Sequence, residues 1–181
     1  MKIRLLVVGA LLSPLVLNSI PVAIAAGTGD SNQVNFTGRF MLGGPCKLDP
    51  QTTDIKLDFT TVVKKELYLH TRTSAIPFTI KLTDCDTTKA DQVVITFSGT
   101  ESALPGALAV TGEATGVAIG MEKPDGTPLP FNKATPGYNL TSGSNNITLQ
   151  AYVIGEPNAI TAQTINAGDF TATATFELAY P

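Results

Sequence analysis

The carboxyl-terminal segment constrains the fold more than any other part of the chain. Between Phe170 and Leu178, apolar residues alternate strictly with threonine and glutamate. Because successive side chains of a β-strand point to opposite faces, this pattern predicts a strand with one buried face. The residues of the apolar phase are Phe170, Ala172, Ala174, Phe176, Leu178 and Tyr180.

A second alternating segment lies near the other end of the chain, ahead of the first cysteine. Its inward phase contains Val34, Phe36, Gly38 and Phe40, and the residues between them are polar. Segments near a chain end are usually disordered unless they pair with other structure. Two strand-like ends therefore indicate a chain that pairs with another strand.

Residues 1–25 have the pattern of a secretory signal. Lys2 and Arg4 precede a long apolar run, which ends at the small-residue site Ala23-Ile24-Ala25. Two prolines and an asparagine interrupt the run, so we expect cleavage and export rather than a retained membrane helix. The remaining residues, 26–181, have the length of one domain.

Charge and cysteine content narrow the possible partners. The formal net charge of −3 provides no basic patch for nucleic acid or anionic lipid. Cys46 and Cys85 are an even pair in an exported chain, which favours a disulfide. A catalytic or metal-binding role for them is the weaker alternative, because the chain has no C-x-x-C motif and a single histidine.

Short strand-like runs alternate with turn residues through the rest of the chain, which predicts an all-β sandwich. A hairpin turn is expected at Pro124-Asp125-Gly126, and Pro77 is expected at a strand edge or start. Thr61–Leu69 is a weak helix candidate. The candidate strands are Ile55–Phe59, Ile76–Leu82, Gln92–Ser98, Gly116–Glu122 and Ile147–Ile154.

Residues that carry chemistry are scarce. His70 is the only histidine and lacks the glycines of a nucleophile elbow, so we interpret it as a surface or loop residue. Asp84 and Asp86 lack the spacing of a calcium loop. Neither a phosphate loop nor a dinucleotide fingerprint is present. We expect no enzyme activity, no cofactor, no metal and no small-molecule substrate.

Several motifs together resemble the pilin subunits of chaperone–usher (type 1-like) fimbriae. A glycine fourteen residues from the end and a penultimate tyrosine are characteristic of that family, and Gly168 and Tyr180 occupy those positions. The resemblance spans the mature chain. The other matching segments are Pro77–Cys85, Gly116–Pro130 and Leu149–Tyr152.

The resemblance implies an incomplete immunoglobulin-like sandwich that lacks its last strand. A groove beside the strand from Gly168 to Pro181 would be filled first by a periplasmic chaperone, which would also hold the carboxylate of Pro181. At an outer-membrane usher, the amino-terminal extension of a neighbouring pilin would replace it, a form of β-strand addition. The subunit would then belong to an adhesive fimbria on the cell surface.

In this scheme residues 26–45 are the donor extension and residues 46–181 are the pilin domain. Val34, Phe36 and Phe40 would enter pockets of the neighbour, and Gly38 would lie where the groove is too narrow for a side chain. Asn32 and Leu42 extend the same face, although the polar side chain of Asn32 is poorly suited to an apolar pocket. In the alternative interpretation, Val34–Phe40 is the first strand of its own domain.

Other functional classes remain open. A single-domain tip adhesin would bind its ligand through loops such as Thr100–Thr115. A terminating or base subunit would donate a strand and accept none. An enzyme from another exported β-sandwich family is the least favoured, because the residues for a nucleophile–base pair are missing.

Overall fold

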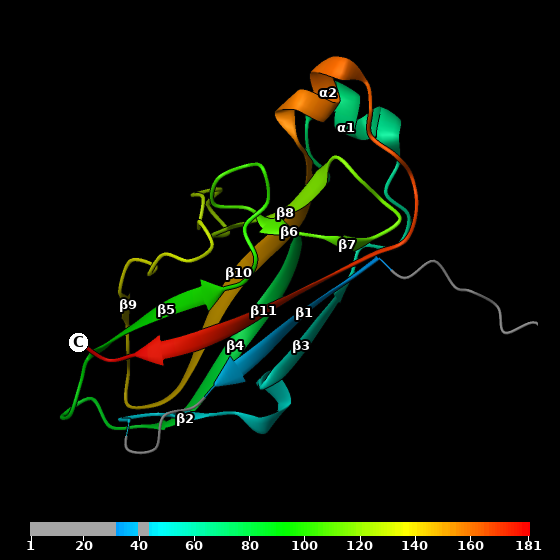
Figure 1. Cartoon of the computed structure of the whole chain (residues 1–181). Coiled ribbons are helices and arrows are strands. Elements are labelled where there is room, and N and C mark those ends of the chain that lie inside the picture. The colour runs from blue at the N-terminus through cyan, green and yellow to red at the C-terminus, as the bar shows by residue number, and fades with distance from the viewer. Residues whose placement is uncertain (1–31, 40–43) are drawn as a thin grey trace, which may run out of the picture.

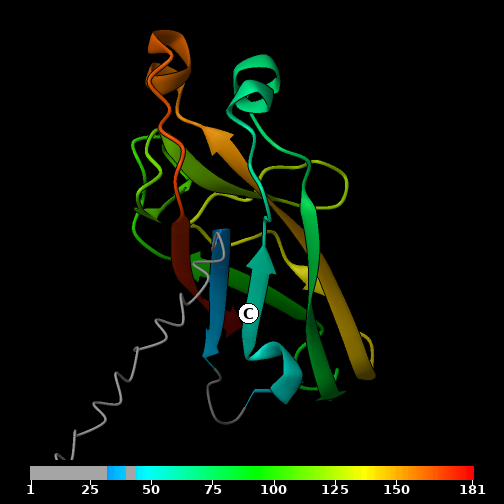
Figure 2. The same ribbon diagram turned by 90° about the vertical axis from the view of Figure 1, so that its right-hand side faces the viewer.

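The computed structural model describes residues 32–39 and 44–181. These residues form two β-sheets packed face to face, with two short α-helices at one end (Figures 1 and 2). Apolar residues on alternate strand positions point between the sheets, as expected for a sandwich core. The all-β fold expected from the sequence is confirmed.

The first sheet contains both ends of the described chain. Strand β1, the second in the sheet, is antiparallel to one neighbour, β3, and parallel to the other, β11. The short strand β7 (Thr111–Gly112) pairs with the start of β11. The strand order is β3 (Asp54–Asp58), β1 (Asn32–Arg39), β11 (Phe170–Ala179), β5 (Gln92–Ser98) and β9 (Tyr138–Asn139).

The second sheet is antiparallel throughout and is built around β10, which is 13 residues long. It pairs with β4 on one side and with β8 on the other, so it ties the middle of the chain together. The strand order is β2 (Lys47–Leu48), β4 (Ile76–Cys85), β10 (Gly143–Gly155), β8 (Val117–Glu122) and β6 (Leu108–Ala109).

The helices are short and lie outside the sandwich core. The 3₁₀ turn η1 (Pro50–Thr52) precedes β3, and α1 (Lys64–His70) connects β3 to β4. Helix α1 ends at Thr71, whose φ of 65° is left-handed and terminates the helix. Helix α2 (Pro157–Ala162) begins with proline, a residue that suits the first helical position because its missing N–H would have no partner there.

Aromatic rings fill the centre of the core. Phe36 lies on Phe78 with the ring centroids 5.0 Å apart, and its edge meets Phe97 at 5.6 Å. Phe97 in turn contacts Phe176 at 5.8 Å. Each sheet thus contributes rings to one cluster, in which Phe36 of β1 lies against Phe78, Phe97 and Phe131.

The disulfide predicted from the sequence is present between Cys46 and Cys85. Both residues are buried, and the bond joins the residue before β2 to the last residue of β4. It therefore fixes the segment before β2 to the end of β4.

The structure confirms the five candidate strands, one of them at both ends and the others to within four residues at their ends. The turn at Pro124-Asp125-Gly126 is closed by the bond from Gly126 N to Lys123 O, 2.8 Å, and Leu129 N donates to Met121 O, also at 2.8 Å. Pro77 is the second residue of β4, near the strand start. The helix candidate Thr61–Leu69 corresponds to α1, which begins three residues later.

Removing the disulfide by the paired change Cys46→Ser and Cys85→Ser should lower the free energy of unfolding by about 4 kcal/mol, because the unfolded chain regains the entropy of a loop with a sequence separation of 39. Urea unfolding measures the loss. As a control, Lys47→Ala removes only an exposed ion pair to Asp84 and should cost about 0.5 kcal/mol or less. A serine variant as stable as this control would contradict the prediction.

Candidate functional site

The candidate site is the position in the first sheet between β3 and β11, which we call the strand slot. In the described chain, β3 and β11 each pair with β1 and not with each other. Phe36 lies beside Ile55 of β3 and Ala174 of β11 in the register of the sheet. Figure 1 shows β1 running between the two strands, parallel to β11. Without β1, both neighbours would present a free backbone edge.

Val34 and Phe36 anchor β1 in the slot. Both have side chains with 0% exposure, although they belong to a segment near the amino terminus. The residues beside them on β11 are Ala172 and Ala174, whose small side chains leave room for the larger ones. Burial of a valine and a phenylalanine contributes roughly 3–6 kcal/mol before ordering costs.

Gly38 lies where the slot is narrowest. It pairs with Phe176, and a Cβ at position 38 would overlap the phenyl ring of Phe176 and lie 2.9 Å from Cδ2 of Leu48. The Gly38 N–H donates to the Thr53 carbonyl at 2.8 Å, which holds the backbone close to the domain. The resemblance implied a narrow place for Gly38 in the groove of a neighbouring subunit, and in the structure Gly38 lies at a narrow place beside β11 of its own chain.

Strand β11 borders the slot on one side, and its inward face is apolar. Phe170, Ala172, Ala174, Phe176 and Leu178 are all buried, in strict alternation with exposed residues. Gly168 lies just before this strand, where a Cβ would come within 3.0 Å of Ala114 N and closer still to Glu113. The chain backbones therefore approach each other too closely there for a larger residue.

The last two residues lie beyond β11. Tyr180 is partly buried beside Gly44, and this burial raises the pKa of its phenol above the ordinary value. Pro181 is exposed at the end of the chain. Phe40 and Leu42, predicted to extend the inward phase of the amino-terminal strand, lie outside the described residues.

Asn32 occupies the end of the slot nearest helix α1. Its side chain is only 6% exposed and lies beside a cavity of about 40 Å³ lined mostly by apolar residues. Its Nδ2 donates to the Thr60 carbonyl, whereas its Oδ1 has no hydrogen-bond partner among the described residues. The apolar residues that line this cavity are Val62, Leu67, Ala114, Val117, Ile165, Ala167 and Phe170.

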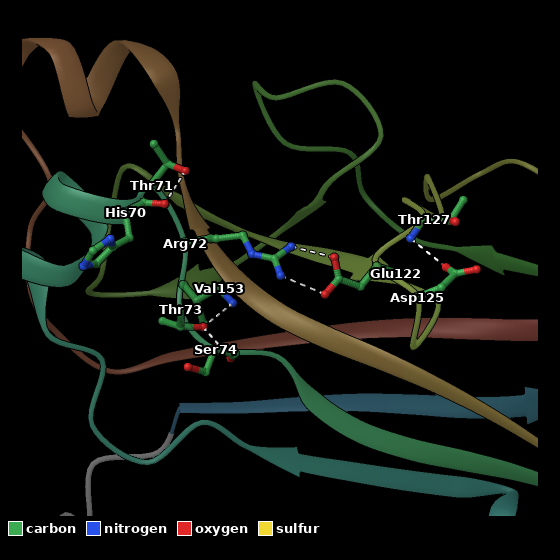
Figure 3. A network of polar contacts seen from close by, with 9 residues as sticks. All are labelled: His70, Thr71, Arg72, Thr73, Ser74, Glu122, Asp125, Thr127 and Val153. Atoms are coloured by element: carbon green, nitrogen blue, oxygen red, sulfur yellow. Dashed lines mark hydrogen bonds and ion pairs between the residues drawn. The ribbon is translucent and has the colours of Figure 1, made fainter.

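A second polar group lies on the outer face of the other sheet (Figure 3). Arg72 donates two hydrogen bonds to the nearly buried carboxylate of Glu122, at 2.6 and 2.8 Å. The guanidinium also lies 4.0 Å from the ring centroid of Tyr152. Hydrogen bonding to Glu122 raises the pKa of Arg72 above its ordinary value. The sequence analysis missed this pair, because its two members are 50 residues apart.

The Arg72–Glu122 pair is arranged as a structural clamp. Both carboxylate oxygens accept from the same guanidinium, and Thr73 accepts a bond from the Val153 N–H at 3.1 Å beside them. These contacts fix the segment after α1 to β8 and β10. In Figure 3 the imidazole of His70 points away from the pair.

Other residues considered for chemistry lie in solvent. Asp84 pairs with Lys47 and Asp86 pairs with Lys89, each at 3.0 Å and each exposed. Over residues 32–39 and 44–181, no group of three or more His, Cys, Asp or Glu residues is placed to hold a metal ion. Within the same ranges, no helix has the length and apolar character needed to span a bilayer.

Replacing Gly38 with leucine should loosen β1, because the side chain cannot fit between Phe176 and Leu48. We expect a loss of about 1–3 kcal/mol in the free energy of unfolding. Hydrogen exchange should also show weaker protection at Val34 and Phe36. The matched control is Thr37→Leu, which adds a leucine on the exposed face of the same strand. Equal stability of the two variants would contradict the assignment of Gly38 as a packing constraint.

Replacing Arg72 with methionine should destabilise the domain by about 3 kcal/mol, because it leaves the buried Glu122 carboxylate without its partner. Thermal or urea unfolding measures the change. Lys47→Met is the matched control, since Lys47 pairs with an exposed carboxylate and its loss should cost less than about 1 kcal/mol. Similar losses in both variants would argue against a structural clamp.

The sequence and fold match known fimbrial proteins. The family model described as "Fimbrial protein" matches residues 34–181. The fimbrial adapter PapK of Escherichia coli is 34% identical over 167 residues, covering 87% of this chain and 93% of PapK.

Two solved structures share the fold. The P pilus rod subunit PapA has a TM-score of 0.67 and 24% identity, covering 76% of this chain and 100% of PapA. A subunit from the structure of a chaperone–usher pilus has a TM-score of 0.68 and 23% identity, with coverages of 79% and 91%. The fold is thus the incomplete immunoglobulin-like sandwich of pilins, here with β1 in the position of the missing strand. The chain belongs to the fimbrial protein family and is a structural subunit of a fimbria.

Proposed function

We propose that this pilin polymerises by strand exchange through the strand slot. In the fimbria, β1 of one subunit fills the slot of its neighbour, and its own slot receives the equivalent strand from the next subunit. One observation carries the proposal: the place between β3 and β11 holds a single strand, and that strand joins the domain through residues 40–45.

The slot recognises a strand by its pattern and not by its connection to the domain. Backbone pairing on both sides is independent of sequence, and the side-chain contacts require apolar residues at positions 34 and 36 and a glycine at 38. An identical segment from a second copy meets the same requirements. Such addition of a strand to a sheet is a recurring mode of protein association.

The contacts supply enough energy for a stable junction. Eight residues of β1 are in register with β11 and five with β3. Each backbone hydrogen bond contributes about 0.5–1.5 kcal/mol net, in addition to the burial of Val34 and Phe36. A slowly dissociating fibre therefore needs no covalent link between subunits.

We further propose that export and assembly follow the chaperone–usher route. Residues 1–25 act as the signal that directs the chain to the periplasm, and residues 26–45 form the donor extension. A periplasmic chaperone fills the slot of residues 46–181 before assembly and holds the Pro181 carboxylate, which is exposed and accessible. An outer-membrane usher then replaces the chaperone strand with β1 of the next subunit and delivers the fibre to the cell surface.

A terminating subunit is the second candidate, because β1 lies in the slot of its own domain. In that function the slot accepts no strand from another subunit. The two candidates differ in one property, namely whether the slot exchanges its occupant.

Uptake of a synthetic strand tests the proposal. The purified mature protein is mixed with a fluorescent peptide covering Ser31–Leu42, and bound peptide is followed by polarisation. We expect uptake by the folded monomer, with release of its own amino-terminal segment detected by proteolysis.

The control peptide carries Gly38→Leu and should bind about five- to 150-fold more weakly, since an overpacked core site costs about 1–3 kcal/mol. A folded monomer that takes up neither peptide over several days would support the terminating subunit and contradict strand exchange.

A further inference from the structure

The buried end of β1 contains a polar residue whose side chain lacks a hydrogen-bond partner for its oxygen. Asn32 lies on the same face of β1 as Val34 and Phe36 and is only 6% exposed. Its side chain is an amide, whereas the next two inward residues are apolar. Its backbone carbonyl accepts a bond from Phe59 N at 2.9 Å, so the main chain is paired as in the rest of the strand. The defect is confined to the side chain.

The Asn32 amide is only half satisfied. Its Nδ2 donates to Thr60, while its Oδ1 is buried without a hydrogen-bond partner in the described part of the chain. The cavity beside it is lined mainly by apolar side chains, including Leu67, Val117 and Phe170. A buried acceptor without a partner costs the free energy of its lost hydration, which corresponds to a factor of about five to 150 in an equilibrium constant.

The inward face of β1 shows no comparable defect at its middle. Asn35 also has a buried Oδ1 without a hydrogen-bond partner in the described chain, but its side chain lies on the outer, partly exposed face of the sheet. Val34 and Phe36 are fully buried among apolar neighbours, and Gly38 fits against Phe176. Within its own slot, β1 is therefore strongly held at its centre and weakly held at the end beside α1. Opening at that end exposes an amide that gains hydration, whereas opening at the centre exposes Phe36.

We propose that Asn32 sets the rate at which β1 leaves its own slot. The inference rests on the proposed strand exchange and adds the residue that controls it. The unpaired amide weakens the self-inserted strand, so that the isolated subunit remains folded but able to accept another strand. A strand with a branched aliphatic residue at this position would compete successfully with β1.

The test replaces Asn32 with leucine, which keeps the branching at Cγ and removes both polar atoms. The adjacent cavity of about 40 Å³ offers space for the larger side chain. In the full mature protein, Asn32→Leu should slow uptake of the wild-type Ser31–Leu42 peptide by at least tenfold. It should also increase hydrogen-exchange protection of the β1 amides by a similar factor.

The matched control is Gln33→Leu, which makes a comparable change one residue away in the outward phase. Uptake by this variant should stay within about twofold of the wild type, because surface substitutions have small effects. Asn32→Val provides a smaller aliphatic side chain if the leucine variant does not fold, and it should slow uptake in the same direction.

The outcomes separate the two proposals. Uptake by the wild type together with equal rates for the Asn32 and Gln33 variants would overturn the role of Asn32 and leave strand exchange intact. Absence of uptake by the wild type would overturn strand exchange itself, and the role of Asn32 with it. Slower uptake only in the Asn32 variants supports both.

Discussion

The pairing of β1 with β3 and β11 is the interaction on which the rest of the structure depends. Within the described chain, β3 and β11 have their only common neighbour in β1. Phe36 of β1 packs in the ring cluster of the core against Phe78, Phe97 and Phe131. Removing the strand would expose two backbone edges and open the core at once, and both consequences favour association with another strand. Residues 46–181 therefore leave this position of the sheet to a strand that precedes them in the chain.

Other features hold the domain together where β1 does not reach. The disulfide fixes the start of the domain to the end of β4, and the Arg72–Glu122 pair fastens the segment after α1 to the second sheet. The disulfide and the ion pair both lie within residues 46–181. In the proposed strand exchange they would remain while the occupant of the slot changes, so that a permanent frame would hold a replaceable strand.

Much of this arrangement could be predicted from the sequence. Strict alternation in Phe170–Leu178 and around Val34–Gly38 identified both strands, since a half-buried strand has a clear period. Pairing of β1 within its own chain was predicted only as the alternative interpretation, because a periodic pattern does not identify the partner of a strand. Helix α2 was missed because it has six residues, among them β-branched Ile160 and Thr161. The unpaired Oδ1 of Asn32 depends on contacts with distant segments, which local sequence does not reveal.

A cryo-electron microscopy structure of the assembled fimbria tests the central claim most directly. The density between β3 and β11 of each subunit should contain the side chains of Val34, Phe36 and Gly38, and it should continue into Cys46 of a neighbouring subunit. The exchanged strand would then account for the whole connection between subunits. Density that continues into Cys46 of the same subunit, with neighbours joined only by surface contacts, would contradict the account.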